Sequence, residues 1–336
     1  MASRDGNGWV RCALGHRHWG RYGAAGLLAY AEDPADPGDP GDPADAGLTG
    51  LAGGTGGLSV LMQRRGAWSH HGGTWGLPGG AADSHESPIA TALREAHEEC
   101  MVPPDAVVIR GIFTDDHGGW AYRTVFGSAP APFPVFPDSD ETDEATWVPA
   151  AEVGALKLHP GLAAHWAELR AGLAPVRVIV DAANVMGSRP DGWWRDRAGA
   201  ARRLVIDVTE LAAAGVPEFP ASLGLPAPAC WYPEFVVVLE GQARGAIPAD
   251  SGGAAASRSG AAGRVGEAVA DGAGVAGAGV RVVSAPGSGD DSIAELAAEL
   301  GGIRLVVTAD RELRARCEAA GAQVTGPRWL TGQLGG

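Results

Sequence analysis

The sequence predicts an α/β protein of two domains. Its 336 residues are more than one compact core usually holds. Short apolar runs typical of buried strands alternate with amphipathic helical patterns along most of the chain. Charge is uneven, because residues 1–175 carry 11 basic and 22 acidic side chains whereas the remainder carries 15 and 18. These observations indicate two modules, which we assign to residues 1–172 and 176–336.

The first domain is expected to contain five strands and two helices. Strand-like runs lie at 24–30, 57–63, 106–114, 119–127 and 144–148, and a helical pattern lies at 160–172. The other helix is predicted at 87–99, with Ser87 as its N-cap and Pro88 in its first position. At 33–46, Asp-Pro recurs every third residue, which excludes a helix or a sheet ladder and predicts an extended insertion.

The second domain repeats a strand–helix alternation. Apolar strands are expected at 176–180, 234–240, 280–285 and 303–309, and helices at 197–214, 290–300 and 310–320. Such an alternation predicts a mainly parallel sheet covered by helices, an α/β/α arrangement. Residues 243–278 are mostly Gly, Ala and Ser, which is typical of a flexible insertion.

Composition restricts the functions that the chain can have. The formal net charge is −14. A surface this acidic disfavours coating of DNA, which needs clustered Lys and Arg, but it permits a small anionic substrate held by a metal ion. The four cysteines form no CxxC pair. No apolar run approaches the length of about 18 residues that spans a membrane. We therefore expect a cytoplasmic protein with no membrane segment.

Three glutamates in the first helix predict a metal site. Glu95, Glu98 and Glu99 stand at i, i+3 and i+4, so they share one helix face without the lysines that a solvated face would interleave. Converging carboxylates suit Mg²⁺ or Mn²⁺. Glu86 precedes the helix and can join them, and Arg94 can orient a glutamate through a bidentate pair.

The stretch from Gly80 to Val102 resembles the Nudix box, in which Gly, Glu and Arg-Glu precede a Glu-Glu pair at fixed spacing. Met101 stands where the family has glycine, a position that affects the turn after the helix. The resemblance implies an α/β/α sandwich with a mixed sheet and Mg²⁺-dependent hydrolysis of a nucleoside-diphosphate-linked substrate. It implies Glu86, Glu95, Glu98 and Glu99 as metal ligands, Arg94 as a catalytic residue, and Gly79 and Gly80 as the loop that approaches the substrate. The base stays open among the box glutamates, Glu141 and Glu144.

All nine histidines precede residue 166. His70 and His71 lie in a Gly-rich loop, for which a solvated loop is favoured over a phosphate contact. Cys12, His16 and His18 suggest zinc, but no second Cys or His pair at ligand spacing accompanies them, which disfavours a zinc site.

Acidic residues, Glu240 among them, follow the predicted parallel strands of the second domain, at the sheet edge where open α/β sheets bind ligands. Asp181 with Asn184, the pair Asp290 and Asp291, and Asp310 resemble the motifs of the PIN-like NYN ribonuclease superfamily. The resemblance implies Asp181, Asp291 and Asp310 as metal ligands, with Asn184 and Asp290 supporting them. RNA is the partner that it implies. Arginines around Trp193 and Trp194 suit either RNA stacking or a core position with paired arginines.

The sequence therefore predicts a Nudix pyrophosphohydrolase joined to a PIN-like domain that cleaves RNA or binds RNA or a nucleotide. The alternative is an RNA-processing or RNA-binding protein whose Nudix domain senses a nucleotide. The intact glutamates of the box favour catalysis, because a sensor does not need a full metal constellation.

Overall fold

The computed structural model describes residues 4–33, 57–190, 192–246, 262–264 and 279–334. The chain divides into two compact units, each described by itself below: unit 1 comprises Met1–Ala174 together with Gly224–Cys230, and unit 2 most of the remainder. The predicted Asp-Pro insertion lies outside the described residues except for Asp33. Of the predicted Gly/Ala insertion, only 243–246 and 262–264 are described. No helix among the described residues is both long and apolar enough to span a membrane.

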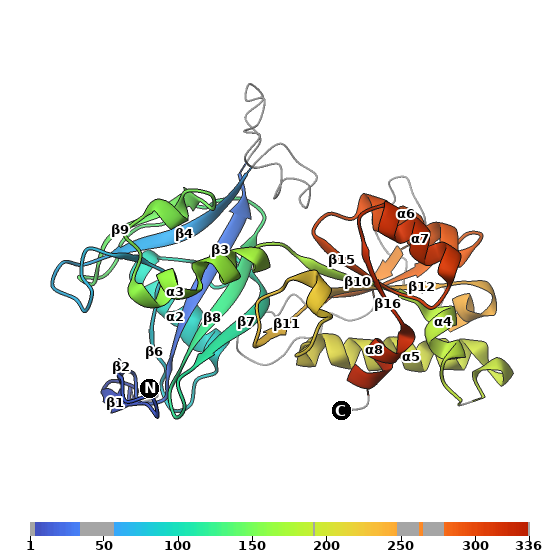
Figure 1. Cartoon of the computed structure of the whole chain (residues 1–336), viewed down its shortest axis with the longest axis horizontal. Helices are drawn as coiled ribbons and strands as arrows, with labels where there is room; N and C mark the ends of the chain where they lie inside the picture. The colour runs from blue at the N-terminus through green and yellow to red at the C-terminus, as the bar shows by residue number, and fades with distance from the viewer. Residues whose placement is uncertain (1–3, 34–56, 191, 247–261, 265–278, 335–336) are drawn as a thin grey trace, which may run out of the picture. The chain divides into compact units, whose positions relative to one another are not determined.

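Unit 1 is built on one mixed sheet (Figure 1). Its strands are β3 (Ala24–Glu32), β4 (Leu58–Arg65), β5 (Trp75–Gly76), β6 (Gly79–Ala81), β7 (Val108–Asp116), β8 (Ala121–Ala129), β9 (Thr142–Pro149) and β11 (Ala229–Trp231). The order is β11-β7-β8-β3-β4-β5, with β6 paired to β3 and β9 to β4. Strand β3 runs parallel to β8 but antiparallel to β4 and β6, which confirms the mixed sheet. A separate hairpin joins β1 (Trp9–Arg11) to β2 (Arg17–Trp19).

The core of unit 1 forms around β3, whose residues from Ala24 to Ala31 are all buried. A strand buried along its whole length needs cover on both faces, which explains its unbroken apolar sequence. Helix α2 (Pro88–Cys100) packs against β3, β6 and β8 through its apolar stripe. The second helix of the unit is α3 (Pro160–Leu169).

Helix α2 begins directly after the predicted N-cap Ser87 and ends at Cys100, one residue beyond the predicted end at Glu99. The Ser87 hydroxyl accepts a hydrogen bond from Ala90 N–H, and Pro88 occupies the first turn. The C-cap of the helix is Met101, whose φ of 58° and ψ of 27° are left-handed. Its N–H donates to the carbonyl of His97 at 3.0 Å. The turn for which the resemblance implies glycine is therefore made here by a residue with a side chain.

Unit 2 is built on a parallel sheet, as predicted (Figure 1). Five strands run parallel in the order β14-β12-β10-β15-β16, and β13 (Ala262–Arg264) adds antiparallel to β14. They are β10 (Val176–Asp181), β12 (Glu234–Leu239), β14 (Val280–Ser284), β15 (Ile303–Val307) and β16 (Gln323–Thr325). The helices are α4 (Ala182–Gly187), α5 (Arg197–Ala214), α6 (Gly289–Glu299), α7 (Arg311–Ala319) and α8 (Pro327–Gln333). Directly before β10, the Pro175 carbonyl accepts a hydrogen bond from Ile303 N–H at 2.9 Å.

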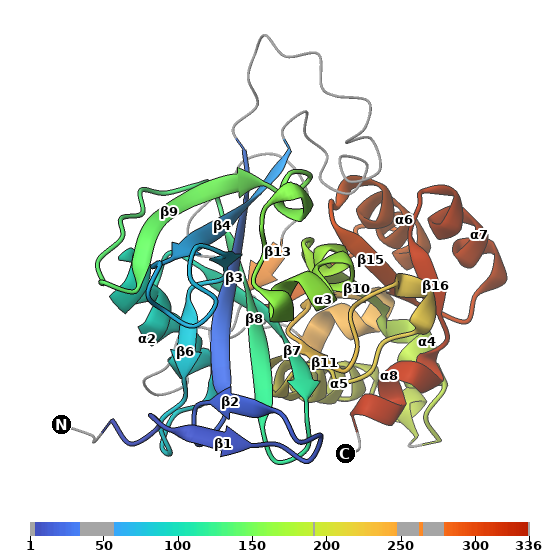
Figure 2. The same cartoon turned by 60° about the vertical axis from the view of Figure 1, so that its left-hand side comes forward.

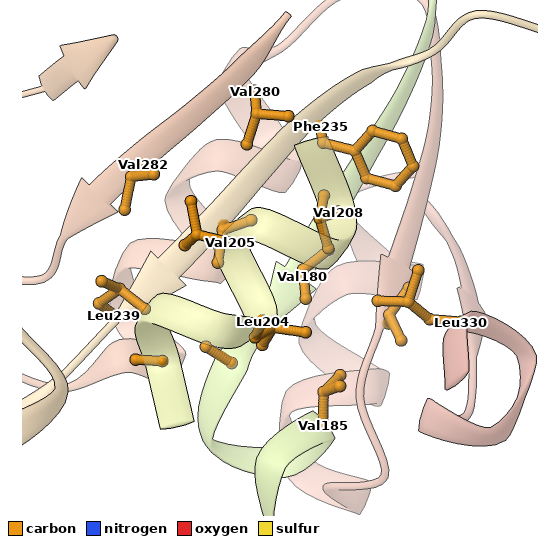
Figure 3. Packing of buried hydrophobic residues seen from close by; sticks show 14 of the residues in the cluster. Val180, Val185, Leu204, Val205, Val208, Phe235, Leu239, Val280, Val282 and Leu330 are labelled. Carbon is orange, nitrogen blue, oxygen red and sulfur yellow. The ribbon is translucent and has the colours of Figure 1, made fainter. Parts of the chain in front are cut away.

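Alternate residues of β10 enter two separate cores. Val178 and Val180 pack with α5 and α8 on one face, where Figure 3 shows Val180 among Leu204, Val208 and Leu330. Ile179 packs on the other face with Ile293 and Leu313 of α6 and α7. Burial on both faces accounts for the continuous Val and Ile content of this strand.

Replacing Met101 with glycine is expected to stabilise the folded protein. A side chain in the left-handed region costs about 1–2 kcal/mol, which glycine does not incur. The greater freedom of glycine in the unfolded chain offsets part of this gain, so we expect the free energy of unfolding to rise by about 0.5–1 kcal/mol. Urea denaturation measures it. Met101→Ala is the control, since alanine keeps the backbone penalty, and equal stability of both variants would contradict the explanation.

Candidate functional site

One arginine of α2 organises the acidic face of the helix. Arg94 Nε and Nη2 donate to the two carboxylate oxygens of Glu86, at 2.7 and 2.9 Å, and Nη2 also donates to the Ala81 carbonyl. Its Nη1 donates to Glu95 at 2.7 Å and to Glu98 at 3.3 Å. The Arg94 hydrogen bonds lower the pKa of Glu86 to about 2, and Glu86 in turn raises the pKa of Arg94. Glu86 and Arg94 therefore form a fixed ion pair beside the other glutamates.

Glu99 is the most deeply buried of the acidic side chains of α2. Its Oε2 accepts hydrogen bonds from Gln63 Nε2 at 2.9 Å and from Gly79 N–H at 2.7 Å. Burial nevertheless dominates, and it raises the pKa of Glu99 to about 8. Gln63 is itself fixed, because Thr142 donates to its Oε1 at 2.8 Å. The neighbourhood of Glu99 thus supplies neutral hydrogen-bond donors, and the cation Arg65 lowers the pKa of Glu99 less than these donors do.

Glu95 lies against the glycine loop. Burial raises its pKa, while Arg94 opposes the shift. A Cβ at Gly80 would lie 2.7 Å from the Glu95 carboxylate, so a side chain there would displace that group. At Gly79, a Cβ would lie 2.5 Å from the Ala25 carbonyl oxygen. Gly79 is therefore required by the close approach of β6 to β3, whereas Gly80 leaves room for the Glu95 carboxylate.

Glu98 is the most accessible of the three, with 32% of its side chain exposed, and it also pairs with Arg4. Among the described residues, groups of His, Cys, Asp or Glu with all ligand atoms within 4.8 Å include Asp83, His85 and Glu86 but not the three α2 glutamates. Arg94 Nη1 instead lies between Glu95 and Glu98. The donor set fits Mg²⁺ or Mn²⁺, because it consists of hard carboxylate oxygens, and the buried carboxylate of Glu99 is held only by neutral hydrogen-bond donors.

The two later glutamates differ in position. Glu141 lines a cavity of about 870 Å³ in unit 1. Glu144, on β9, forms an ion pair with Arg64 at 3.5 Å and does not line that cavity. Of these two carboxylates, Glu141 is the one that a bound ligand can reach.

The cavity has an aromatic wall and a few cationic groups. Its lining includes Gly79 and Gly80, the rings of Trp9, Trp19, Trp68, Phe113, Trp120 and Tyr122, several histidines, and Arg17 and Arg65. His70 and His71 lie in this wall beside His159, so their loop is part of the cavity. Burial lowers the pKa of His159 to about 4. A cavity of this size and lining suits a nucleotide.

In unit 2, several of the predicted residues meet at the carboxyl edge of the sheet. Asp181, at the end of β10, is buried and accepts hydrogen bonds from Asn184 Nδ2 at 2.7 Å and Thr308 Oγ1 at 2.8 Å. Burial raises its pKa. Burial also raises the pKa of Asp290, with further contributions from Asp181 and Asp310. Asp310 caps α7 through the Leu313 N–H at 2.8 Å.

Asp291 does not join this edge. Its side chain is 63% exposed and pairs with Arg316 at 2.8 Å. Glu240 is a further member of the edge, because its carboxylate accepts from Gly289 N–H at 2.8 Å and raises the pKa of Asp181. The two tryptophans differ in burial, because Trp193 packs against the core whereas Trp194 is exposed.

Comparison with known proteins assigns unit 1. Residues 43–169 match the profile of the NUDIX domain. A relative from Mycobacterium tuberculosis, named "Putative 8-oxo-dGTP diphosphatase 3", is 42% identical over 178 residues, which are 51% of this chain and 72% of the relative. The chain belongs to the Nudix family. A second relative, from Bifidobacterium longum, is named a nucleoside triphosphate pyrophosphatase/Nudix hydrolase fusion protein. It is 40% identical over 172 residues, but the match spans only 32% of its length.

Solved structures extend the comparison. The Nudix hydrolase RenU from M. smegmatis is 40% identical, with 49% of this chain and 93% of that chain covered and a TM-score of 0.41. Rae1 (YacP) from Bacillus subtilis is 14% identical, with 47% and 74% covered and a TM-score of 0.30. Similarity this low assigns neither a family nor an activity to unit 2.

The Nudix site predicts a pH dependence of stability in the metal-free chain. The pKa of Glu99 is about 8 when folded, against an ordinary value of 4.5, so the folded chain binds more protons than the unfolded chain between these values. The free energy of unfolding should therefore fall as the pH rises from about 4.5 to about 8, by on the order of 1 kcal/mol per pH unit in the middle of that range, and should level off above it. Urea denaturation with a chelator measures the slope, and Glu99→Gln should remove it. An equal slope in the variant would contradict the assignment.

Proposed function

We propose that unit 1 is a Mg²⁺-dependent pyrophosphohydrolase of nucleoside triphosphates, with oxidised guanine nucleotides among its substrates. The observation that carries the proposal is the acidic face of α2, packed against the glycine loop that lines an aromatic cavity. The name of the M. tuberculosis relative supports oxidised dGTP as the first substrate to test.

The glutamates of the Nudix box divide into two groups in this proposal. Glu95, Glu98 and Glu99 would hold the divalent ion, which neutralises diphosphate charge and makes water a better nucleophile. Glu86 uses both its oxygens on Arg94, so we assign it to positioning Arg94 and not to direct ligation. Arg94 in turn orients Glu95 and Glu98. Glu141 is the added carboxylate that we propose as a proton acceptor, because it lines the cavity.

Substrate binding follows from the chemistry of the cavity wall. The rings of Trp9, Trp68 and Trp120 offer faces on which a base can stack. Arg17 and Arg65 supply positive charge for phosphate oxygens in a wall that otherwise has little of it. The histidines of the wall include His159, which burial holds neutral, and they can donate or accept hydrogen bonds at the base or sugar.

Glu98→Gln is expected to reduce turnover by at least about 100-fold, because it removes a charged ligand without changing side-chain size. The measurement is Mg²⁺-dependent release of pyrophosphate from 8-oxo-dGTP, dGTP and other nucleotides at saturating Mg²⁺. Glu144→Gln is the matched control, since the same chemical change is made outside the cavity, and it should keep near-normal kcat. Glu141→Gln should lower kcat.

Near-normal kcat in Glu98→Gln would contradict the metal-ligand assignment. Tight nucleotide binding by the unaltered chain without any turnover would instead favour the alternative function, in which the Nudix domain senses a nucleotide.

A second candidate function is favoured by one observation in unit 2. Asp181, Asp290, Asp310 and Glu240 interact electrostatically at one sheet edge, and burial raises the pKa of two of them. We propose that this edge binds a divalent ion and acts on, or binds, RNA or a nucleotide. Asp290 takes the ligand role in this proposal, because Asp291 is turned toward Arg316.

In a full-length chain that also carries Glu98→Gln, Asp181→Asn should weaken Mn²⁺ binding by unit 2 at least about 10-fold and remove any cleavage of single-stranded RNA. Calorimetry and an RNA cleavage assay measure the two effects. Asp291→Asn is the matched control and should change neither. If the Glu98→Gln chain binds no Mn²⁺ that Asp181→Asn weakens, the carboxylates at this edge are structural. The proposal for unit 2 is then wrong.

A further inference from the structure

The β1–β2 hairpin carries three residues of types that bind metals within seven positions. Cys12 and His16 lie in its turn and His18 lies on β2. The turn is tight, because Cys12 N–H donates to the His16 carbonyl and Gly15 N–H donates to the Cys12 carbonyl, each at 3.0 Å. Gly15 has a φ of 83°, which favours glycine. The backbone of this turn therefore fixes Cys12 and His16 close to each other.

A second turn, between β7 and β8, supplies a fourth residue of this kind. His117 N–H donates to the Trp120 carbonyl at 2.9 Å, and glycines with positive φ, Gly118 and Gly119, lie between them. Ala13 N–H of the first turn donates to the Gly118 carbonyl at 2.8 Å. Figures 1 and 2 both show the hairpin beside this end of β7 and β8. The fold thus brings His117 to residues that are about 100 positions earlier in the sequence.

One ligand atom from each of Cys12, His16, His18 and His117 lies within 4.8 Å of the other three. Cys12 is buried, His18 and His117 are partly buried and His16 is exposed. Two ring nitrogens, His18 Nε2 and His117 Nδ1, are buried without a hydrogen-bond partner. Burying a polar atom without a partner is unfavourable, and buried polar atoms of native proteins rarely lack one. Both nitrogens belong to the same group of four residues, so one shared ligand would satisfy them together.

The remaining contacts orient the two rings as metal ligands. His117 Nε2–H donates to Asp115 Oδ2 at 3.0 Å, which leaves the lone pair on Nδ1. A carboxylate behind a histidine is a common support of metal-binding histidines. His18 stacks on Trp120, with ring centroids 3.9 Å apart and an interplanar angle of 10°. The ring planes are therefore set by groups that lie outside the four candidate ligands.

We propose that Cys12, His16, His18 and His117 bind one Zn²⁺ ion in a tetrahedral site. One sulfur and three imidazole nitrogens suit Zn²⁺, whereas Mg²⁺ prefers oxygen ligands. Ligand atoms around zinc are separated by roughly 3.3–3.8 Å, so the distances between the four ligand atoms need to shorten by at most about 1.5 Å when the ion binds. The Cys12 thiol proton is released to solvent, and the nearby Asp115 carboxylate balances the remaining positive charge.

Four protein ligands fill the coordination of the ion, so the site is structural and does not activate water. It joins the β1–β2 hairpin to the β7–β8 turn. His16, His18 and His117 also line the cavity, together with Trp9 and Trp19 of the same hairpin. Zinc would therefore fix one wall of the proposed nucleotide site. The zinc proposal itself rests only on the four ligands and their contacts, so it can stand if the proposed substrate is wrong.

Metal content and Co²⁺ spectroscopy of the full chain, prepared without a polyhistidine tag, test the proposal. We expect about one zinc per chain, and a tetrahedral Co²⁺ spectrum with a sulfur-to-cobalt charge-transfer band after substitution. Cys12→Ser should remove that band, and His117→Ala should remove most of the bound metal. Asp115→Asn should keep the fold and weaken Zn²⁺ binding by about 10–100-fold.

His71→Ala is the matched control, because His71 belongs to a separate histidine group with His70 and His159. It should leave the zinc content and the charge-transfer band unchanged. Loss of zinc in His71→Ala but not in Cys12→Ser, or a purified chain that binds no zinc when Zn²⁺ is added, would overturn the proposal. If the ligand variants fail to fold, titration of the unaltered chain with a zinc chelator decides, since removal of zinc should lower its thermal midpoint.

Discussion

The Nudix site depends on the ion pair between Arg94 and Glu86. Because both oxygens of Glu86 are occupied by the guanidinium, the remaining N–H groups of Arg94 are aimed at Glu95 and Glu98. Three like charges on one helix face would otherwise repel each other and turn toward solvent. The pair also binds the Ala81 carbonyl at the end of β6, so it fixes the helix to the glycine loop. The geometry of the acidic face is therefore set by a group that need not touch metal or substrate.

Both units concentrate negative charge where burial opposes it, but they do so on different scaffolds. In unit 1 the carboxylates lie along a helix, and Glu99 is satisfied by an amide and a backbone N–H. In unit 2 they lie at the ends of parallel strands, where Asp181 is held by Asn184 and Thr308. Neutral donors orient a carboxylate without cancelling its charge. That arrangement keeps the carboxylate available to a cation that arrives later.

The fold class and the helix of the Nudix box could be predicted from the sequence because both depend on local periodicity. Ser87, Pro88 and the glutamate spacing determine where α2 begins and which face is acidic. Contacts between distant segments could not be predicted in this way. Gln63 is one polar residue in a strand, and its bond to Glu99 follows only from the pairing of the sheet. The choice between Asp290 and Asp291 depends on how the first turn of α6 is rotated, which spacing does not reveal.

His117 shows the same limit for the cysteine and histidine group. Its distance along the chain from His18 hides a cluster that the backbone bond between Ala13 and Gly118 creates. Local ligand spacing detects a metal site only when the ligands come from one or two short segments.

The carbonyl of Pro175 bears on how unit 2 can be produced separately. A fragment that starts at Val176 would lack the acceptor of the Ile303 N–H at the beginning of β15. Gly302, with a φ of 79°, packs against that same carbonyl, and a Cβ there would lie 2.3 Å from the oxygen. A fragment that starts a few residues upstream would retain these contacts of the Pro175 carbonyl, which connect β10 to β15. Truncation at Val176 would keep every residue of β10 but would remove the carbonyl that binds the beginning of β15.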